Sequence, residues 1–219
     1  MAYSKETAKR LTELLGEIEG RKEHSNAAAT YKDIPALKKI VRSVESQLIH
    51  DNEESTLVDS IAILRYVADR YDSLGRFAVS AKLYSQILGL ALRLKQQYGV
   101  DTDGIDSIFY VALRARNFYV DDDCDDLMNI ASELMNTGDA QRILNERKER
   151  RRSLKHDPVE MTEEYLAVID EVEERVEKNR TTYGHGSCHE VWSLKKSYLL
   201  EHGIAWHTPA ELNPRVHFD

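Results

Sequence analysis

The chain has few residues that break helices. Its 219 residues include only ten glycines and four prolines. Because these two residue types interrupt regular structure, long segments are free to stay helical, and the apolar residues recur at intervals of three and four rather than two. This spacing argues against a protein built of β-sheet. It predicts an all-α fold of about eight helices with a small loop-rich element near the C-terminal end.

Cysteine and long apolar runs are also scarce. The two cysteines, Cys124 and Cys188, lie far apart and lack the density of a disulfide framework, which favours a reducing compartment. No apolar stretch approaches the length of a membrane span, and the N-terminal segment lacks the uninterrupted apolar core of a signal peptide. We therefore expect a cytoplasmic protein that does not enter a membrane.

Positive charge is in deficit, since the formal net charge is −8 at pH 7. This balance disfavours a general attraction to nucleic acid or to anionic membranes. The main local exception is a basic block between Arg142 and Lys155. No Phe, Tyr or Trp interrupts this block, so it offers no platform on which bases could stack. The block favours a solvated helix, with nucleic-acid binding as the alternative.

Glycines bound the helix that we expect from Phe77 to Tyr98. Gly75 makes the turn before it, and Gly99 is placed as its C-terminal stop. A third glycine, Gly89, lies inside this helix, where glycine costs about 1 kcal/mol relative to alanine. We expect a close contact with another helix to explain it.

The same signals predict three further helices. The first runs from Ile105 to Tyr119, and the second is closed by Gly138. The third starts at Asp157 and Pro158, because proline is favoured in the first turn of a helix and a carboxylate follows.

Small and aromatic residues alternate at helical spacing on both sides of Gly75. This pattern lets two antiparallel helices pack closely around a tight turn, and it resembles one tetratricopeptide (TPR) repeat. An ordinary helical hairpin needs the same residues and is the alternative. The residues that carry the pattern are Ala68, Tyr71, Gly75, Phe77, Ser80, Tyr84 and Ile87.

The TPR resemblance implies stacked antiparallel helical hairpins with a groove for a peptide or a partner helix. The TPR-like core would span about residues 55–138 of a helical domain that covers residues 1–180. The family supplies no catalytic residues. Four arginines on the first helices of the pairs are candidates for holding an acidic peptide: Arg65, Arg70, Arg114 and Arg116.

The segment around Cys188 carries residue types that suit catalysis. Ser187 and Glu190 fit a capping box, so a helix is predicted from Ser187 to about His202. Backbone N–H groups and the helix dipole at that N-terminus would stabilise a thiolate. With His185 close in sequence, Cys188 and His185 are candidate catalytic residues.

This segment resembles parts of two families of cysteine enzymes. The sequence Gly-Ser-Cys-His at residues 186–189 resembles the start of papain-type proteases, and residues 186–204 resemble the cysteine helix of transglutaminase-like proteins. Either resemblance implies that Cys188 is a nucleophile and that a His and an Asp follow on strands. Since Pro209 and Pro214 interrupt the remaining residues, no strand of useful length fits there.

The same segment also suggests zinc. His185 and Cys188 have the spacing of a zinc-ligand pair, and His189 and His207 are further candidate ligands. The second pair is irregular in spacing. Zinc therefore stands as an alternative to capping, surface or partly buried histidines.

We place a subdomain boundary where the composition changes, so that residues 181–219 form a C-terminal helix and a docked tail. Residues 183–219 resemble the C-terminal ends of uncharacterised bacterial proteins, which implies no activity. A short helix with a capping box is predicted at Thr208–Glu211. Three aromatic residues are expected to dock against the helical body or across an oligomer interface: Trp192, Trp206 and Phe218.

These patterns favour a non-enzymatic function, namely protein–protein interaction or scaffolding through a TPR-like surface. The expected partner is a protein or peptide, no cofactor is expected, and a homo-oligomer stays open. The competing interpretation is a metal- or thiol-dependent enzyme that uses the segment Gly184–His189.

Overall fold

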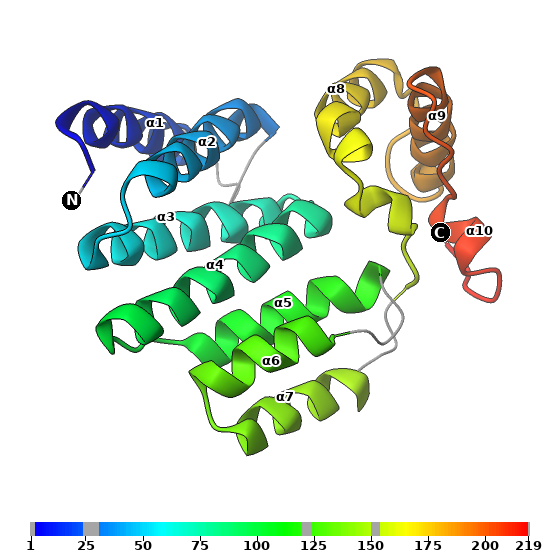
Figure 1. Cartoon of the computed structure of the whole chain (residues 1–219). Helices are drawn as coiled ribbons and strands as arrows, with labels where there is room; N and C mark the ends of the chain where they lie inside the picture. Colours follow the sequence, from blue (N-terminus) through cyan, green and yellow to red (C-terminus); the bar gives the residue numbers. More distant parts are fainter. Residues whose placement is uncertain (1–2, 24–30, 120–123, 150–153, 219) are drawn as a thin grey trace. The chain divides into compact units, whose positions relative to one another are not determined.

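The structure is a computed structural model that describes residues 3–23, 31–119, 124–149 and 154–218. Over these ranges the chain is helical and contains no strand, which confirms the predicted all-α class (Figure 1). None of the helices described is both long and apolar enough to cross a membrane. The α-helices are α1 (Lys5–Glu23), α2 (Ile34–His50), α3 (Glu54–Ser73), α4 (Phe77–Tyr98), α5 (Ile105–Tyr119), α6 (Asp125–Leu134), α7 (Thr137–Glu149), α8 (Glu163–Asn179), α9 (Ser187–Glu201) and α10 (Pro209–Leu212).

The helices divide between two compact units. Unit 1 comprises Met1–Ala115 and Asp123–Glu149, and unit 2 comprises Arg116–Asp122 and Arg150–Asp219. The boundary expected at residue 181 falls inside unit 2, between α8 and α9. These two helices share one hydrophobic cluster, which is why they belong to the same unit.

In unit 1, each helix of the series from α1 to α4 contacts the next, and α4 then contacts α6. Helix α1 contacts α2, α2 contacts α3, α3 contacts α4, α4 contacts α6, and α6 contacts α7 (Figure 1). A single hydrophobic core runs through these helices. Five of its fully buried side chains come from five successive helices: Leu11, Leu37, Leu64, Leu88 and Phe109.

The turn between α3 and α4 has the geometry that its glycine predicts. Gly75 has a φ of +72°, and the N–H of Arg76 donates to the carbonyl of Tyr71 at 2.9 Å. Together with the bond from the N–H of Gly75 itself, this is a Schellman motif, which satisfies the last carbonyls of α3. Ala68 on α3, before the turn, and Tyr84 on α4, after it, are both buried, and the two helices contact each other, so their predicted packing role is confirmed.

Helix α4 has the predicted bounds, but the expectation for Gly89 is wrong. Gly99 ends the helix with a φ of +67°. Gly89 is exposed, and a Cβ placed on it would meet no heavy atom within 4 Å. No close helix contact therefore requires a glycine at this position.

The expected helix end at Gly138 is also wrong. Helix α6 ends at Leu134, and a new helix, α7, begins at Thr137. The side chain of Asn136 accepts a hydrogen bond from the N–H of Gly138 at 2.7 Å. Gly138 thus lies in the first turn of α7, where its free N–H needs a capping acceptor.

Unit 2 begins with a short helix that precedes α8. Asp157 and Pro158 start the 3-10 helix η2 (Pro158–Met161) rather than a long α-helix. The side chain of Asp157 accepts from the N–H of Val159 at 3.0 Å. Thr162 then caps α8 by accepting from the N–H of Tyr165 at 3.3 Å. The predicted start is therefore corrected to Thr162.

The core of unit 2 lies among α8, α9 and the tail. The apolar stripe of α8 is buried with Leu199 of α9 and with Ile204 and Trp206 of the tail. Trp192 and Phe218 pack edge to face, with ring centroids 5.0 Å apart. The capping box of α10 forms as predicted, between Thr208 and Glu211. The members of the α8 stripe are Tyr165, Ile169, Val172 and Val176.

Candidate functional site

The arginines predicted to hold a peptide already have partners or lie outside the described side chains. Arg70 is 7% exposed, and it donates to Glu19 at 2.8 Å and to the hydroxyl of Tyr66 at 3.0 Å. Arg65 donates to the carbonyl of Asp103 at 3.5 Å. Arg70 therefore links α3 to α1, and it is not a free cation in a groove.

The other two arginines of that set, Arg114 and Arg116, fall in α5. Their side chains lie outside the residues that the structure describes.

The segment before α9 is shaped by two glycines. Gly184 has a φ of +88° and Gly186 a φ of +79°. Helix α9 starts at Ser187, so Cys188 is its second residue, a half-buried free thiol. The hydroxyl of Ser187 donates back to the carbonyl of Gly184 at 2.7 Å. His185 is exposed.

The capping box expected at this helix does not form, because Glu190 binds elsewhere. Its carboxylate accepts from the backbone N–H groups of Thr181 and Thr182 at 3.0 and 2.7 Å, and from both threonine hydroxyls. The hydroxyl bonds of Thr182 and Thr181, followed by the two backbone bonds, lower the pKa of Glu190 from 4.5 to about 2. Glu190 thus anchors the segment at Thr181 and Thr182 that precedes the glycines.

The four candidate metal ligands do not converge. His189 contacts the carbonyl of Phe218 at 3.3 Å, whereas the Nδ1 atom of His207 lies 2.8 Å from Asp157. Within residues 3–23, 31–119, 124–149 and 154–218, no three His, Cys, Asp or Glu side chains gather as a metal site would require. This holds for His185 and Cys188 as well.

Unit 2 contains two buried carboxylates, Asp157 and Glu160, which the sequence predicted only as signals of a helix start. Asp157 accepts from both the backbone N–H and the ring of His207, at 2.7 and 2.8 Å. Burial raises the pKa of Asp157, but the hydrogen bonds from Val159 and His207 outweigh it and hold that pKa below its ordinary value. Glu160 accepts from the indole N–H of Trp206 at 2.7 Å.

The Asp157–His207 pair orients an imidazole whose side chain is 62% exposed. In catalytic triads such a pair serves a nucleophile that bonds to the second ring nitrogen. Among the described residues, no hydroxyl or thiol bonds to His207. The pair therefore holds the tail, together with Asn213, which exchanges two bonds with the backbone of Lys155.

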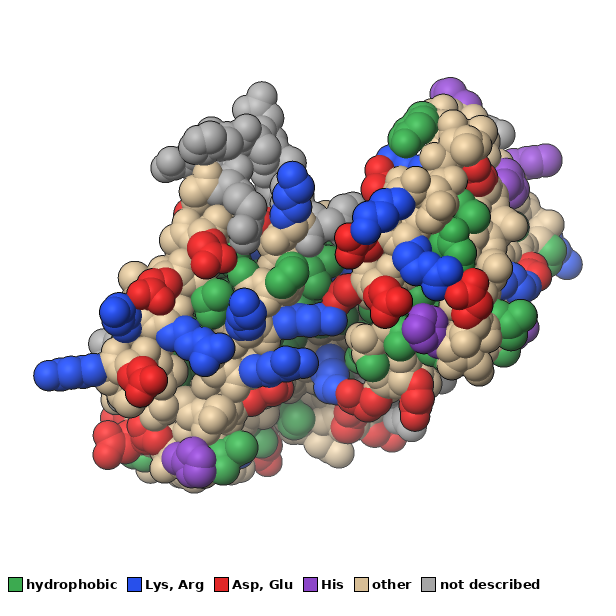
Figure 2. Space-filling model, turned by 90° about the horizontal axis from the view of Figure 1, so that it is seen from above, with side chains coloured by type: hydrophobic (Ala, Val, Ile, Leu, Met, Phe, Trp, Pro, Cys, Tyr) green, Lys and Arg blue, Asp and Glu red, His purple; other side chains and the backbone are tan. Residues whose placement is uncertain are grey.

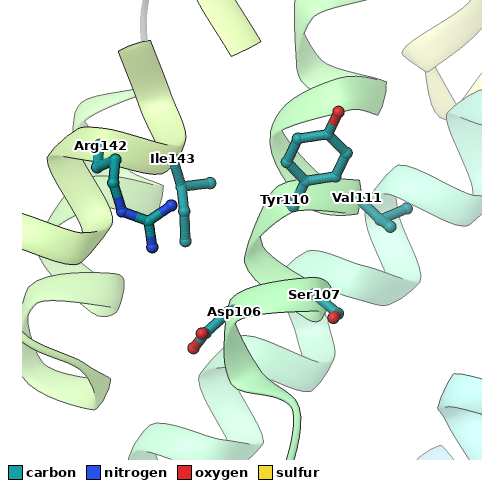
Figure 3. A pocket seen from close by; sticks show the side chains of 6 residues that line it. All are labelled: Asp106, Ser107, Tyr110, Val111, Arg142 and Ile143. Atoms are coloured by element: carbon teal, nitrogen blue, oxygen red, sulfur yellow. The ribbon is translucent and has the colours of Figure 1, made fainter. Parts of the chain in front are cut away.

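A cavity of about 450 Å³ lies between α5 and α7 (Figure 3). Its one lining cation among the described residues is Arg142, which already pairs with Glu146 at 2.9 Å and with Asp139 at 3.6 Å. These local pairs agree with the solvated helix predicted for the basic block as far as Glu149, where α7 ends; residues 150–153 of the block lie outside the described part of the chain. The cavity is lined by Asp106, Ser107, Tyr110, Val111, Arg142 and Ile143.

A groove of about 550 Å³ lies between α1 and α2, and we call it the α1/α2 groove. In the described part of the chain, its three cations, Arg10, Lys39 and Arg42, form no ion pair. Glu6 is the one carboxylate of the lining. Figure 2 shows Lys and Arg side chains gathered on the face that carries these two helices. The complete lining is Glu6, Thr7, Arg10, Lys39, Arg42, Ser43, Ser46, Gln47 and His50.

These three cations were not predicted as a site, because the apolar stripes used to place the helices lie on their buried faces. A usable signal was present on the opposite face of α2. Lys39 has no acidic residue three or four positions away, and Arg42 follows it by three residues. Arg10 could not be added to them without knowing that α1 packs beside α2.

No family model, curated protein or solved structure matches the chain.

Proposed function

We propose that this chain is a protein-binding module that holds an acidic segment of a partner protein in the α1/α2 groove. The observation that supports this is the set of three unpaired cations, Arg10, Lys39 and Arg42, around one depression on two packed helices. By contrast, Arg142 in the cavity between α5 and α7 pairs with Glu146, and Arg70 pairs with Glu19. An unpaired cation can bind an external carboxylate without first losing an internal partner.

The expected strength follows from exposure. The three cations are exposed, so each ion pair with a bound peptide contributes up to about 1 kcal/mol and weakens with salt. Three such pairs distinguish an acidic peptide from a neutral one by up to about 100-fold. The groove thus provides selectivity for charge, with modest affinity.

A peptide suits this groove better than a nucleic acid. No Phe, Tyr or Trp belongs to its lining, so bases would have no ring on which to stack. The chain as a whole has a net charge of −8, which repels a polyanion with a charge on every nucleotide more strongly than a short peptide with one or two carboxylates. Both cysteines are free thiols, which supports the proposal of a cytoplasmic, reducing location.

The test compares two double variants of the full chain that lose the same charge. Arg10→Gln/Arg42→Gln removes cations of the groove, and Lys5→Gln/Lys9→Gln removes exposed cations of α1 that do not line it. The probe is a fluorescein-labelled peptide of alternating Glu and Ser, with a Gln/Ser peptide as its neutral match. We expect the groove variant to bind the acidic peptide about tenfold more weakly in fluorescence anisotropy, and the control variant to bind like the parent protein.

Two results would overturn the proposal. One is equal binding of the acidic and neutral peptides by the parent protein. The other is tighter binding of labelled oligothymidylate than of the acidic peptide, with the same dependence on Arg10 and Arg42. That outcome would assign the groove to single-stranded nucleic acid.

A further inference from the structure

An exposed apolar side chain, Ile49, lies on α2 next to residues that line the α1/α2 groove. Ile49 is 74% exposed, the highest value among the large apolar residues that the structure describes as exposed. It follows Arg42 by seven residues and Ser46 by three on α2. Residues at these intervals share one face of a helix, so Ile49 extends the stripe that Arg42 and Ser46 begin.

From this stripe we infer that the partner segment combines acidic residues with one large apolar residue, which packs on Ile49. The inference rests on the proposed function, because it assumes that the groove binds an acidic peptide. Seven helical residues advance about 10 Å along α2. A peptide in the extended polyproline II conformation advances about 3.1 Å per residue with three residues per turn, so side chains three positions apart lie on the same side and span about 9 Å. The apolar residue therefore lies three positions from the acidic residue that meets Arg42.

Hydrogen-bonding groups between the two ends favour an extended peptide over a helix. The hydroxyl of Ser46 is exposed and forms no bond with any described residue. Gln47 donates its amide N–H to Asp51 and keeps its amide oxygen for another donor. A bound helix satisfies its own backbone, whereas an extended peptide offers backbone N–H and C=O groups to such side chains.

The partner chemistry is therefore a short extended segment with one or two Glu or Asp residues and a Leu, Ile, Met or Phe three positions away. The geometry of α2 sets this spacing in either chain direction. A shorter spacing would place the apolar side chain over Ser46 and a polar surface.

The experiment uses the full chain and four labelled peptides. The first contains Glu-Glu-Ser-Ser-Leu, the second the reversed order, the third Glu-Glu-Leu-Ser-Ser, and the fourth Ser in place of Leu. We expect the first or the second to bind about tenfold more tightly than the fourth, and the third to bind like the fourth. Ile49→Ser should abolish the preference for Leu while leaving the binding of the fourth peptide unchanged.

Val58→Ser is the matched control, since Val58 is an exposed apolar residue of α3 that does not line the groove. It should keep the preference for Leu. If Ile49→Ser retains the preference, or if the spacing has no effect, the inference fails. If the fourth peptide still binds in a manner that depends on Arg10 and Arg42, the proposed function survives that failure. If no peptide binds the parent protein, both fail.

Discussion

Gly89 is an internal glycine that the fold does not require. It is exposed in the middle of α4, and a Cβ at this position would meet no heavy atom within 4 Å. Gly89→Ala therefore adds no clash, while it removes backbone freedom from the unfolded chain. We expect a gain of about 0.8–1.0 kcal/mol in the free energy of unfolding. For a protein of this length, that gain raises the Tm by about 2–4 °C.

Gly75→Ala is the matched control. A Cβ at Gly75 would also meet open space, but the φ of Gly75 is +72°. A left-handed conformation costs a non-glycine residue about 1–2 kcal/mol. The two substitutions add the same methyl group to positions with the same free space, so opposite signs isolate the effect of the backbone.

Urea unfolding can assign these changes to unit 1. The two tryptophans of the chain, Trp192 and Trp206, both lie in unit 2, so their fluorescence reports that unit, whereas circular dichroism at 222 nm reports helices of both units. Gly89→Ala should therefore move the unfolding of unit 1, seen by circular dichroism, to higher urea concentration, and should leave the fluorescence transition of unit 2 unchanged. A loss of stability in Gly89→Ala would refute the reasoning, because it would reveal a contact that only glycine permits.

Two further expectations concern unit 2. Trp206→Phe removes the indole N–H that donates to buried Glu160, so it should lower the free energy of unfolding of this unit by about 2 kcal/mol. Urea titrations followed by the fluorescence of Trp192 measure this change. An unchanged free energy of unfolding would contradict the role of that bond. Because the folded pKa of Glu190 is lowered to about 2, its stabilisation is present above about pH 4.5 and is lost as the pH falls toward 2. The amide signal of Thr182 in NMR should titrate with a midpoint near pH 2 in the parent protein and should not titrate in Glu190→Gln.

Helix ends were predictable where a left-handed glycine decides them. The bounds predicted for α4 match those of the structure, because Gly75 and Gly99 both adopt a positive φ that other residues avoid. This preference is local, so the sequence near each glycine contains the information. Gly138 shows the limit of this signal, since a glycine in a first turn looks the same in sequence as one after a last turn.

Signals with a distant competitor misled the prediction. Glu190 fits a capping box with Ser187, but four donors on Thr181 and Thr182 bind it instead. Glu160 has the position of a helix-starting carboxylate, yet its partner is Trp206, 46 residues away. Such partners become neighbours only after the chain folds.

The candidate site was the least predictable part for the same reason. Arg70 has the sequence context of a solvent-facing cation, but Glu19 reaches it from a different helix. Conversely, the α1/α2 groove collects Arg10 with Lys39 and Arg42 only because α1 lies beside α2. Cations that lie together on one helix can be predicted from their spacing in the sequence, whereas cations brought together from two helices can be found only when the packing of those helices is known.

Hydrogen bonds join the segment that precedes α8 to the tail that follows α9. They connect Lys155 with Asn213 and Asp157 with His207. Proteins whose termini adjoin tolerate circular permutation when the new ends fall in an exposed turn. The turn at Gly184 is exposed and would be a suitable place to open the chain. A short linker could then join the old ends, so that α9 and the tail come before α8 in the sequence while the same cluster packs.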